Sequence, residues 1–328
     1  TTSSVDKGEA VLNLVTTIVN ESDTNENITV CSSLQDAEGR EVAETRSSGE
    51  AEAGKEVVFT QQLTVKQPQL WDIDTPYLYT LVTKVMRNEE CMDRYTTPVG
   101  IRTFSFDARK GFTLNGRQTK INGVCMHHDL GCLGAAVNTR AIERQLQILK
   151  EMGCNGIRCS HNPPAPELLD LCDRMGFIVM DEAFDMWRKK KTAHDYARYF
   201  NEWHERDLND FILRDRNHPS VILWSIGNEL AEAKLKDDTG IERAGMLQDF
   251  VHQLDPSRLV MLALQPGFED KFASVTDVLG YNYMEPRLIY DKKKYPERIC
   301  LISESYPYYS SIREFDSRDY DEKNPWNY

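Results

Sequence analysis

The sequence predicts two domains of different fold class, an all-β sandwich over residues 1–107 and an α/β barrel of the (β/α)8 type over residues 108–328. Three observations predict this. A chain of 328 residues has room for about two domains of average size. The first third alternates short strand-like segments with turns, and the remainder alternates apolar strands with amphipathic helices. A hydrophobic content of 40% is enough to build both cores and excludes disorder as the main state.

The first domain is predicted from segments rich in β-branched and aromatic residues, which are separated by turns such as Asp36-Ala37-Glu38-Gly39. These segments are residues 10–19, 27–34, 55–65 and 77–86. Within residues 55–65 apolar and polar residues alternate, which is the period of a strand. About a hundred residues with strands at this spacing favour an immunoglobulin-like sandwich. Its usual disulfide is not expected, because Cys31 and Cys91 lack the usual tryptophan context.

A hairpin is expected next, since Asn115-Gly116 supplies the positive φ angles of a two-residue turn. Beyond it, apolar strands alternate with helices that have one apolar face, and Gly153 and Gly176 follow two of these helices as stop signals. The predicted strands are residues 119–126, 156–160, 177–182, 221–227, 259–264, 278–283 and 299–304. The predicted helices are residues 139–152, 166–175, 196–214 and 241–254.

Near-continuous apolar strands that alternate with helices indicate a parallel sheet with helices outside. Seven such units favour a (β/α)8 barrel over a doubly wound sheet, and no strand is followed by a G-x-G-x-x-G or P-loop motif. The seventh predicted strand ends near residue 305, and the remaining residues amount to one helix at most. The sequence therefore predicts a barrel whose eighth strand is missing.

The charge balance excludes several classes of partner. With 39 basic and 52 acidic residues the net charge is −13, which gives no electrostatic footprint for nucleic acid or anionic lipid. The longest basic run, Arg188 to Lys191, is predicted to be a surface loop. No apolar stretch approaches the ~20 residues that span a bilayer, so membrane insertion is not expected. The sequence does not open with a basic and apolar leader, so no signal peptide is expected. Its compartment stays open, because a periplasmic, secreted or cytoplasmic location is compatible with these features.

The eight cysteines are Cys31, Cys91, Cys125, Cys132, Cys154, Cys159, Cys172 and Cys300. None forms a CxxC pair, and most lie in apolar runs. We expect small buried side chains and neither disulfides nor a metal site.

Polar and ionisable residues follow nearly every predicted barrel strand. Because catalytic residues of such barrels lie at the C-terminal ends of the strands, these residues are expected to converge on one mouth. Glu229 follows the fourth strand and Glu304 ends the seventh, so the two carboxylates would face each other. A facing pair suits glycoside hydrolysis, in which one carboxyl protonates the leaving oxygen and the other attacks or activates water. Arg158, in the second strand, would hold Glu304 ionised through a charge-assisted hydrogen bond.

Four segments carry a family resemblance. They are Gly100-Ile-Arg-Thr-Phe with the following hairpin and Ile121-Asn-Gly-Val-Cys-Met-His-His; Ile157-Arg-Cys-Ser-His-Asn-Pro-Pro; Arg214-Asp-Arg-Asn-His-Pro-Ser-Val-Ile-Leu-Trp-Ser-Ile-Gly-Asn-Glu; and Ile302-Ser-Glu-Ser. On these motifs the sequence resembles glycoside hydrolase family 2, the family of β-galactosidases, β-glucuronidases and β-mannosidases. The match runs nearly end to end, and the third segment is the most specific.

The resemblance implies a retaining mechanism. The residues that match the family's catalytic set are Glu229 as acid/base, Glu304 as nucleophile, Tyr283 as a hydrogen-bond partner of the nucleophile, and Arg158 near the same carboxylate. The resemblance also implies that Asn228 hydrogen-bonds the sugar 2-hydroxyl and that His127 and His161 line the sugar site.

Two more residues are candidates for substrate binding. Asp181 ends the third predicted strand, where both structural hydrogen bonding and direct sugar contact are open. Trp187 follows it and is either a stacking platform for a sugar ring or a packing residue.

The sequence departs from the family pattern in three places. The magnesium-dependent β-galactosidases carry Glu-x-His shortly after the third strand, where this chain has Met186 and Arg188, so no magnesium and no other cofactor are expected. The jelly-roll domain that precedes the sandwich in the family is not in this sequence. The last barrel strand, and the asparagine-lysine pair with which β-glucuronidases bind the uronate, would fall beyond Tyr328. The sequence therefore does not define the sugar.

The resulting hypothesis is a retaining exo-β-glycosidase, most simply a β-galactosidase, that acts on a carbohydrate and, as the resemblance implies, forms a homo-oligomer. The alternatives are β-glucuronidase or β-mannosidase activity, or an inactive fragment that serves as a carbohydrate-binding scaffold. A metal-dependent barrel hydrolase has little support, because His127 and His128 are adjacent and point to opposite faces of a strand. The carboxyls of Glu229 and Glu304 are expected about 5–5.5 Å apart, as a retaining pair requires.

Overall fold

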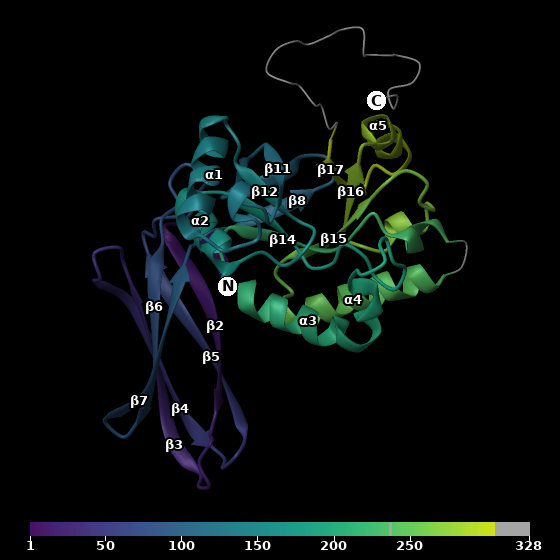
Figure 1. Cartoon of the computed structure of the whole chain (residues 1–328). Coiled ribbons are helices and arrows are strands. Elements are labelled where there is room, and N and C mark those ends of the chain that lie inside the picture. The colour runs from purple at the N-terminus through teal and green to yellow at the C-terminus, as the bar shows by residue number, and fades with distance from the viewer. Residues whose placement is uncertain (236–237, 306–328) are drawn as a thin grey trace.

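The computed structural model describes residues 1–235 and 238–305, which form a β-rich part and an α/β part (Figure 1). The strands of the first part are β1 (Thr2–Asp6), β2 (Glu9–Val19), β3 (Glu26–Gln35), β4 (Glu41–Ala51), β5 (Glu56–Lys66), β6 (Tyr79–Arg87) and β7 (Glu90–Val99). They form two antiparallel sheets, β1-β2-β5 and β4-β3-β6-β7. Alternate residues of β5 are buried, and Leu63 packs with Leu12 and Leu34 from the other strands. The predicted all-β sandwich is confirmed.

The predicted strands of this domain correspond to β2, β3, β5 and β6, whereas β1, β4 and β7 were not predicted. Strand β4 has the sequence EVAETRSSGEA, which offers almost no apolar residue, and most of it is exposed or half-buried. Its backbone pairs with β3 along nearly its whole length. Pairing with a neighbour, and not burial of its own side chains, therefore keeps this segment extended.

A small antiparallel sheet follows, made of β8 (Phe104–Asp107), β9 (Gly111–Leu114) and β10 (Arg117–Gln118). The predicted hairpin joins β9 and β10, and both turn residues have positive φ, 51° at Asn115 and 75° at Gly116. Strand β8 pairs with β9 across residue 107. The domain boundary placed at that residue stays a prediction.

The α/β part is a parallel sheet of seven strands whose spatial order follows the sequence. The strands are β11 (Gly123–His127), β12 (Gly156–Ser160), β13 (Ile178–Glu182), β14 (Val221–Asn228), β15 (Leu259–Leu264), β16 (Val278–Asn282) and β17 (Ile299–Glu304). The helices are α1 (Thr139–Glu151), α2 (Pro166–Met175), α3 (Phe200–Asp215), α4 (Thr239–Leu254) and α5 (Glu285–Lys294). Figure 1 shows α3 and α4 side by side on the outside of the sheet.

The barrel-type fold is thus confirmed, with its predicted strands in place. Helix α5 was not predicted, because its sequence EPRLIYDKKK has no sustained apolar stripe and Asp291 is its one buried residue. The expected absence of an eighth strand concerns residues outside the described ranges.

Buried polar contacts join the sandwich to the barrel. Trp71 is fully buried, and its indole N–H donates to the main-chain oxygen of Asp173 at 2.8 Å. The guanidinium of Arg102 donates to the carbonyl oxygens of Pro219 and Val221, where β14 begins. Because the sandwich packs against this end of β14, the opposite, C-terminal end of that strand lies away from this junction.

All eight cysteines are free thiols, as expected, but their predicted burial is mostly wrong. Only Cys159 and Cys172 are buried, whereas Cys91, Cys125 and Cys132 are exposed. Apolar neighbours in the sequence do not bury a residue when it lies on the open side of a strand or in a loop. Among the described residues, no helix combines the length and apolar character needed to cross a bilayer.

Candidate active site

The predicted site residues lie at the C-terminal ends of the barrel strands. Glu304 ends β17, and Glu229 directly follows β14. A cavity of about 1190 Å³ lies between strands β11 and β17, which form the edges of the described sheet. It is lined by Glu304, Tyr283, Arg158 and His127 among others. The lining also includes Ile121 and Ile299, near the starts of β11 and β17, so the mouth residues line one end of this cavity.

Glu304 is held as a carboxylate by two donors. The Arg158 guanidinium donates to its Oε1 at 2.7 Å, and the Tyr283 hydroxyl donates to its Oε2 at 2.5 Å. Burial by itself would raise the pKa of Glu304, but these two hydrogen bonds outweigh it and hold the pKa below the usual glutamate value. Burial and the Glu304 carboxylate in turn raise the pKa of Tyr283, so its phenol remains a donor at neutral pH.

Arg158 is the centre of the charged network. It is 1% exposed, and it donates to both oxygens of Glu182 at 2.8–3.1 Å and to Asn228 Oδ1 at 2.9 Å as well as to Glu304. Glu182 also accepts from the Ser225 hydroxyl at 2.5 Å. Burial would lower the pKa of Arg158, but the Glu182 and Glu304 carboxylates outweigh it and raise the pKa. The guanidinium is therefore fixed in place and charged.

Glu182 was not predicted as a site residue, although it orients both Arg158 and His161. The His161 Nδ1 lies 2.7 Å from Glu182 Oε1, and its Nε2 lies 3.7 Å from Glu304 Oε1. The ring of His127 meets that of His161 edge-on, with centroids 5.1 Å apart. The structure therefore places His161 beside Glu304 and His127 beside His161.

Glu229 has a different environment from Glu304. Its Oε1 accepts a hydrogen bond from the neutral amide of Asn282 at 3.0 Å, and within residues 1–235 and 238–305 its carboxyl makes no ion pair. Its backbone has φ 47°, a left-handed conformation that is unfavourable for a residue with a Cβ. The Glu229 N–H donates to the carbonyl of Ala263 at 2.7 Å, which helps to hold this conformation. Tyr283 is also left-handed, with φ 56°, so strained backbone occurs at two site residues.

Asn282 joins the two halves of the network and was not predicted. Its Nδ2 donates to Asn228 Oδ1 at 3.1 Å as well as to Glu229, while its Oδ1 accepts from the Ser303 hydroxyl at 2.6 Å. Asn282 and Ser303 are buried. The interactions therefore run without a break from Glu229 through Asn282 and Asn228 to Arg158.

Two predicted substrate-binding residues lie away from this network. Asp181 neighbours Glu182 on β13, so their side chains point to opposite faces of the sheet. Glu182 points into the barrel, and Asp181 is fully buried beneath α3, where burial and the nearby Asp215 raise its pKa well above the usual range. Of the two roles that the sequence left open for Asp181, direct contact with a sugar is therefore excluded and a structural role remains.

The second correction concerns Trp187, which the sequence left as either a stacking platform for a sugar or a packing residue. It is fully buried, its indole N–H donates to the carbonyl of Ile226 at 2.8 Å, and its ring packs near Phe200 and Phe272. A ring without an exposed face cannot stack on a sugar, so Trp187 is a packing residue.

The positions that would supply a magnesium site do not fit a magnesium ion. Met186 is 7% exposed and offers a thioether, which is a poor ligand for this hard cation. Arg188 is exposed and has no lone pair to donate.

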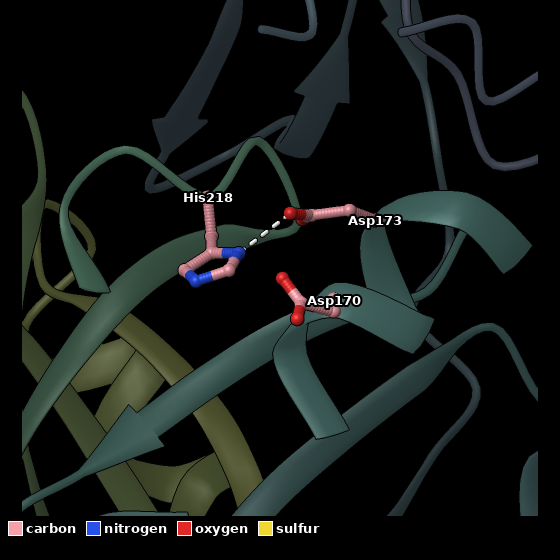
Figure 2. Close-up of side chains that lie close together, drawn as sticks. All are labelled: Asp170, Asp173 and His218. Carbon is pink, nitrogen blue, oxygen red and sulfur yellow. Dashed lines mark hydrogen bonds and ion pairs between the residues drawn. The ribbon is translucent and has the colours of Figure 1, made fainter. Parts of the chain in front are cut away.

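A cluster of possible metal ligands lies elsewhere, at the start of β14. Asp170 and Asp173 of α2 and His218 place their ligand atoms within 4.8 Å of one another (Figure 2). The Asp173 Oδ2 already pairs with His218 Nδ1 at 2.6 Å, and its Oδ1 accepts the N–H of Ser220 at 2.9 Å. Burial would lower the pKa of His218, but the Asp173 carboxylate outweighs it and raises the pKa. His218 Nδ1 and both oxygens of Asp173 are thus already engaged by protein groups, so we interpret the cluster as an ion pair that fixes the start of β14.

Replacement of His218 by alanine is expected to lower the free energy of unfolding by about 1.5–3 kcal/mol near pH 5.5, which is the range for hydrogen bonds to charged groups. Because the folded-state pKa of His218 is raised, its stabilisation is complete below the unfolded-state pKa and is lost as the pH rises through the folded-state value. The cost should therefore be smaller at pH 8.5. Urea titrations of the wild type and variant at both pH values measure it, with exposed His194→Ala as control. A cost that grows with pH would contradict the ion pair.

Comparison with known families identifies both parts of the chain. A model of the TIM barrel domain of glycosyl hydrolases family 2 matches residues 107–306. A second model, described as glycosyl hydrolases family 2, matches residues 1–102.

Individual proteins give the same result. The chain is 72% identical over 337 residues to "Beta-galactosidase BoGH2A" of Bacteroides ovatus, which covers 93% of this chain and 40% of that protein. It is 30% identical over 314 residues to a "Putative beta-glucuronidase" of Formosa agariphila, covering 94% of this chain and 36% of that protein. A crystal structure of a glycosyl hydrolase family 2 member from Bacteroides cellulosilyticus superposes with a TM-score of 0.90 at 38% identity, covering 93% of this chain and 40% of that one. The chain thus spans about two fifths of the length of these relatives.

Proposed function

The chain belongs to glycosyl hydrolase family 2, and from this membership we propose that it hydrolyses terminal β-galactosides with retention of configuration. The family implies a carbohydrate substrate. The choice of galactose rests on the relative that is 72% identical and is named a β-galactosidase. Part of this proposal is also that the protein forms a homo-oligomer, which light scattering of the full-length gene product would measure.

One observation carries the mechanism, namely the contrast between two carboxyls at the same barrel mouth. Glu304 accepts from a guanidinium and a phenol, whereas Glu229 accepts from a neutral amide. A retaining glycosidase needs one ionised carboxylate as nucleophile and one protonated carboxyl as acid. The two donors on Glu304 fit the nucleophile, which leaves Glu229, the other carboxyl at this mouth, as the proposed acid/base.

In the first step, an oxygen of Glu304 forms a bond to the anomeric carbon while the bond to the leaving oxygen breaks. Glu229 gives its proton to that oxygen, so the aglycone leaves as a neutral alcohol. In the second step, Glu229 takes a proton from water, whose oxygen attacks the anomeric carbon and releases Glu304 as a carboxylate. Arg158 and Tyr283 stabilise that carboxylate before the first step and after the second.

The substrate is tested by assaying the full-length gene product, and this chain beside it, with nitrophenyl β-galactoside, β-glucuronide, β-mannoside and β-glucoside. We expect the full-length product to hydrolyse the galactoside and to release the β-anomer first, as seen by proton NMR. Preferred hydrolysis of the glucuronide would favour the second candidate function, since the relative at 30% identity is named a putative β-glucuronidase. If the full-length product hydrolyses none of the four glycosides, a non-catalytic carbohydrate-binding scaffold would be favoured.

Replacement of Tyr283 by phenylalanine is expected to shift the acidic limb of kcat/KM to higher pH. The Tyr283 hydroxyl helps to hold the pKa of Glu304 low, and activity is lost as the pH falls through that pKa because the nucleophile is protonated. Without this donor the pKa rises, so activity is lost at a higher pH. A pH profile of kcat/KM measures the shift, with exposed Tyr199→Phe as the matched control. An unchanged acidic limb would show that Tyr283 does not tune Glu304.

Removal of divalent metals is expected to leave kcat/KM unchanged, because Met186 and Arg188 offer neither a carboxylate nor an imidazole where the magnesium-dependent members have both. We therefore propose that no metal takes part. Activity is measured after dialysis against EDTA, beside a magnesium-dependent β-galactosidase treated in the same way. A loss that magnesium restores would contradict this prediction.

A further inference from the structure

The basic run Arg188 to Lys191 does not behave as one surface feature. Arg188, Lys189 and Lys190 are exposed. Lys191 is exposed as a residue too, but its side chain is only 26% exposed and turns toward the end of β14. Its ammonium donates to Asp185 Oδ1 at 2.6 Å and to the main-chain oxygen of Asn228 at 3.0 Å. One lysine of the run therefore contacts the residue that precedes Glu229.

The loop that carries Lys191 is tied down by acidic side chains at two points. The N–H groups of Lys191 and Thr192 donate to Asp195 Oδ2 at 2.6 and 2.8 Å. The N–H of Lys189 donates at 2.8 Å to Glu232, which is 2% exposed and follows β14. These bonds fix the backbone on both sides of Lys191, so only its side chain has to be ordered for the contact with Asn228.

Asp185 also determines which way the Asn228 amide faces. The Asn228 Nδ2 donates to Asp185 Oδ1 at 3.0 Å, while its Oδ1 accepts from Arg158 and Asn282 at 2.9 and 3.1 Å. Donors on one side and a carboxylate on the other leave a single orientation of the amide. An amide nitrogen has two N–H groups, and the bond to Asp185 uses one of them. The second N–H is then available to donate to a bound molecule.

We propose that Asp185 and Lys191 are positioning residues that fix Asn228 as a hydrogen-bond donor to the 2-hydroxyl of the sugar. This rests on the proposed function, in which Asn228 contacts that hydroxyl. Hydrogen bonds to the 2-hydroxyl of a glycoside strengthen in the transition state, so loss of the correct amide orientation lowers the rate of the chemical step. Lys191 acts by neutralising Asp185 and by holding the main chain of Asn228 from the other side.

The test compares two substrates, nitrophenyl β-galactoside and its 2-deoxy analogue, with the full-length gene product. Asp185→Ala and Lys191→Met are each expected to lower kcat/KM for the galactoside by about tenfold or more, the order of a hydrogen bond to a charged group. Neither variant should change kcat/KM for the 2-deoxy analogue, which has no hydroxyl for Asn228 to contact. Lys190→Met, an exposed neighbour in the same loop, is the matched control. For the galactoside, kcat/KM of the double variant with Asp185→Ala and Asn228→Ala should be no lower than that of Asn228→Ala alone.

An equal loss on both substrates would overturn the proposal, because it would show a general structural role. Losses that add in the double variant would overturn it as well. If Asp185→Ala does not fold, Lys191→Met alone gives the same substrate comparison. The wild-type rate on the galactoside reports separately on the proposed function, and an enzyme that prefers another of the four glycosides is tested with the 2-deoxy analogue of that sugar.

Discussion

Replacement of Glu304 by alanine is expected to lower kcat by about 10⁴-fold or more, as removal of a catalytic nucleophile does in other enzymes. Without the carboxylate no glycosyl-enzyme forms, and water would have to attack the anomeric carbon directly. The fold should persist, because Arg158 keeps its hydrogen bonds to Glu182 and Asn228 when it loses Glu304. Turnover of nitrophenyl β-galactoside and the thermal midpoint, measured on the same preparation of the full-length product, separate these two effects.

The same variant allows a direct check of the covalent step. A 2-deoxy-2-fluoro galactoside with a good leaving group should add one glycosyl mass to the wild type, on the peptide that contains Glu304. The Glu304→Ala protein should gain none. Glu285→Ala is a suitable control, since this glutamate begins α5 and its carboxyl makes no hydrogen bond to a described residue. Label on another peptide, or undiminished turnover, would show that Glu304 is not the nucleophile.

The sequence was sufficient for the barrel because each strand is a short, almost wholly apolar run between amphipathic helices. Burial on both faces leaves this signal most clearly in β12 to β16, whose residues are buried almost throughout. The sandwich has strands such as β4 whose side chains are mostly exposed and which are kept extended by pairing with a neighbouring strand, here β3. The sequences of β1, β4 and β7 lack the apolar alternation of a half-buried strand, so these three strands were missed.

The same reasoning explains which residues of the site could be predicted from the sequence. Residues that end a strand could be predicted to reach the mouth, and Glu304, Arg158, Tyr283 and Asn228 do contact one another there. The sequence could not say which of two adjacent acids points inward. Asp181 and Glu182 are adjacent. Which of the two side chains points into the barrel depends on the register of β13 with β12 and β14. Asn282 was missed because its role depends on side chains from two other strand ends, those of β14 and β17.

Replacement of Glu229 by alanine is expected to lower kcat/KM in proportion to the need of the leaving group for a proton. A nitrophenolate is a stable anion that leaves with little protonation, so the first step should slow only slightly. A poor leaving group such as a second sugar should lose the full contribution of a general acid, about 10²–10⁴-fold. With the good leaving group the glycosyl-enzyme on Glu304 should accumulate, because no base remains to activate water.

Azide then distinguishes Glu229 from Glu304 by the stereochemistry of the product. In Glu229→Ala, azide needs no base and attacks the glycosyl-enzyme from the face that the aglycone left, so the rate should recover and the product should be the β-galactosyl azide. In Glu304→Ala, azide would take the place of the nucleophile and give the α-galactosyl azide. Proton NMR of the two products therefore assigns both carboxyls in one experiment. An α-azide from Glu229→Ala would reverse the roles, and two variants without any rescue would remove the case for this carboxyl pair.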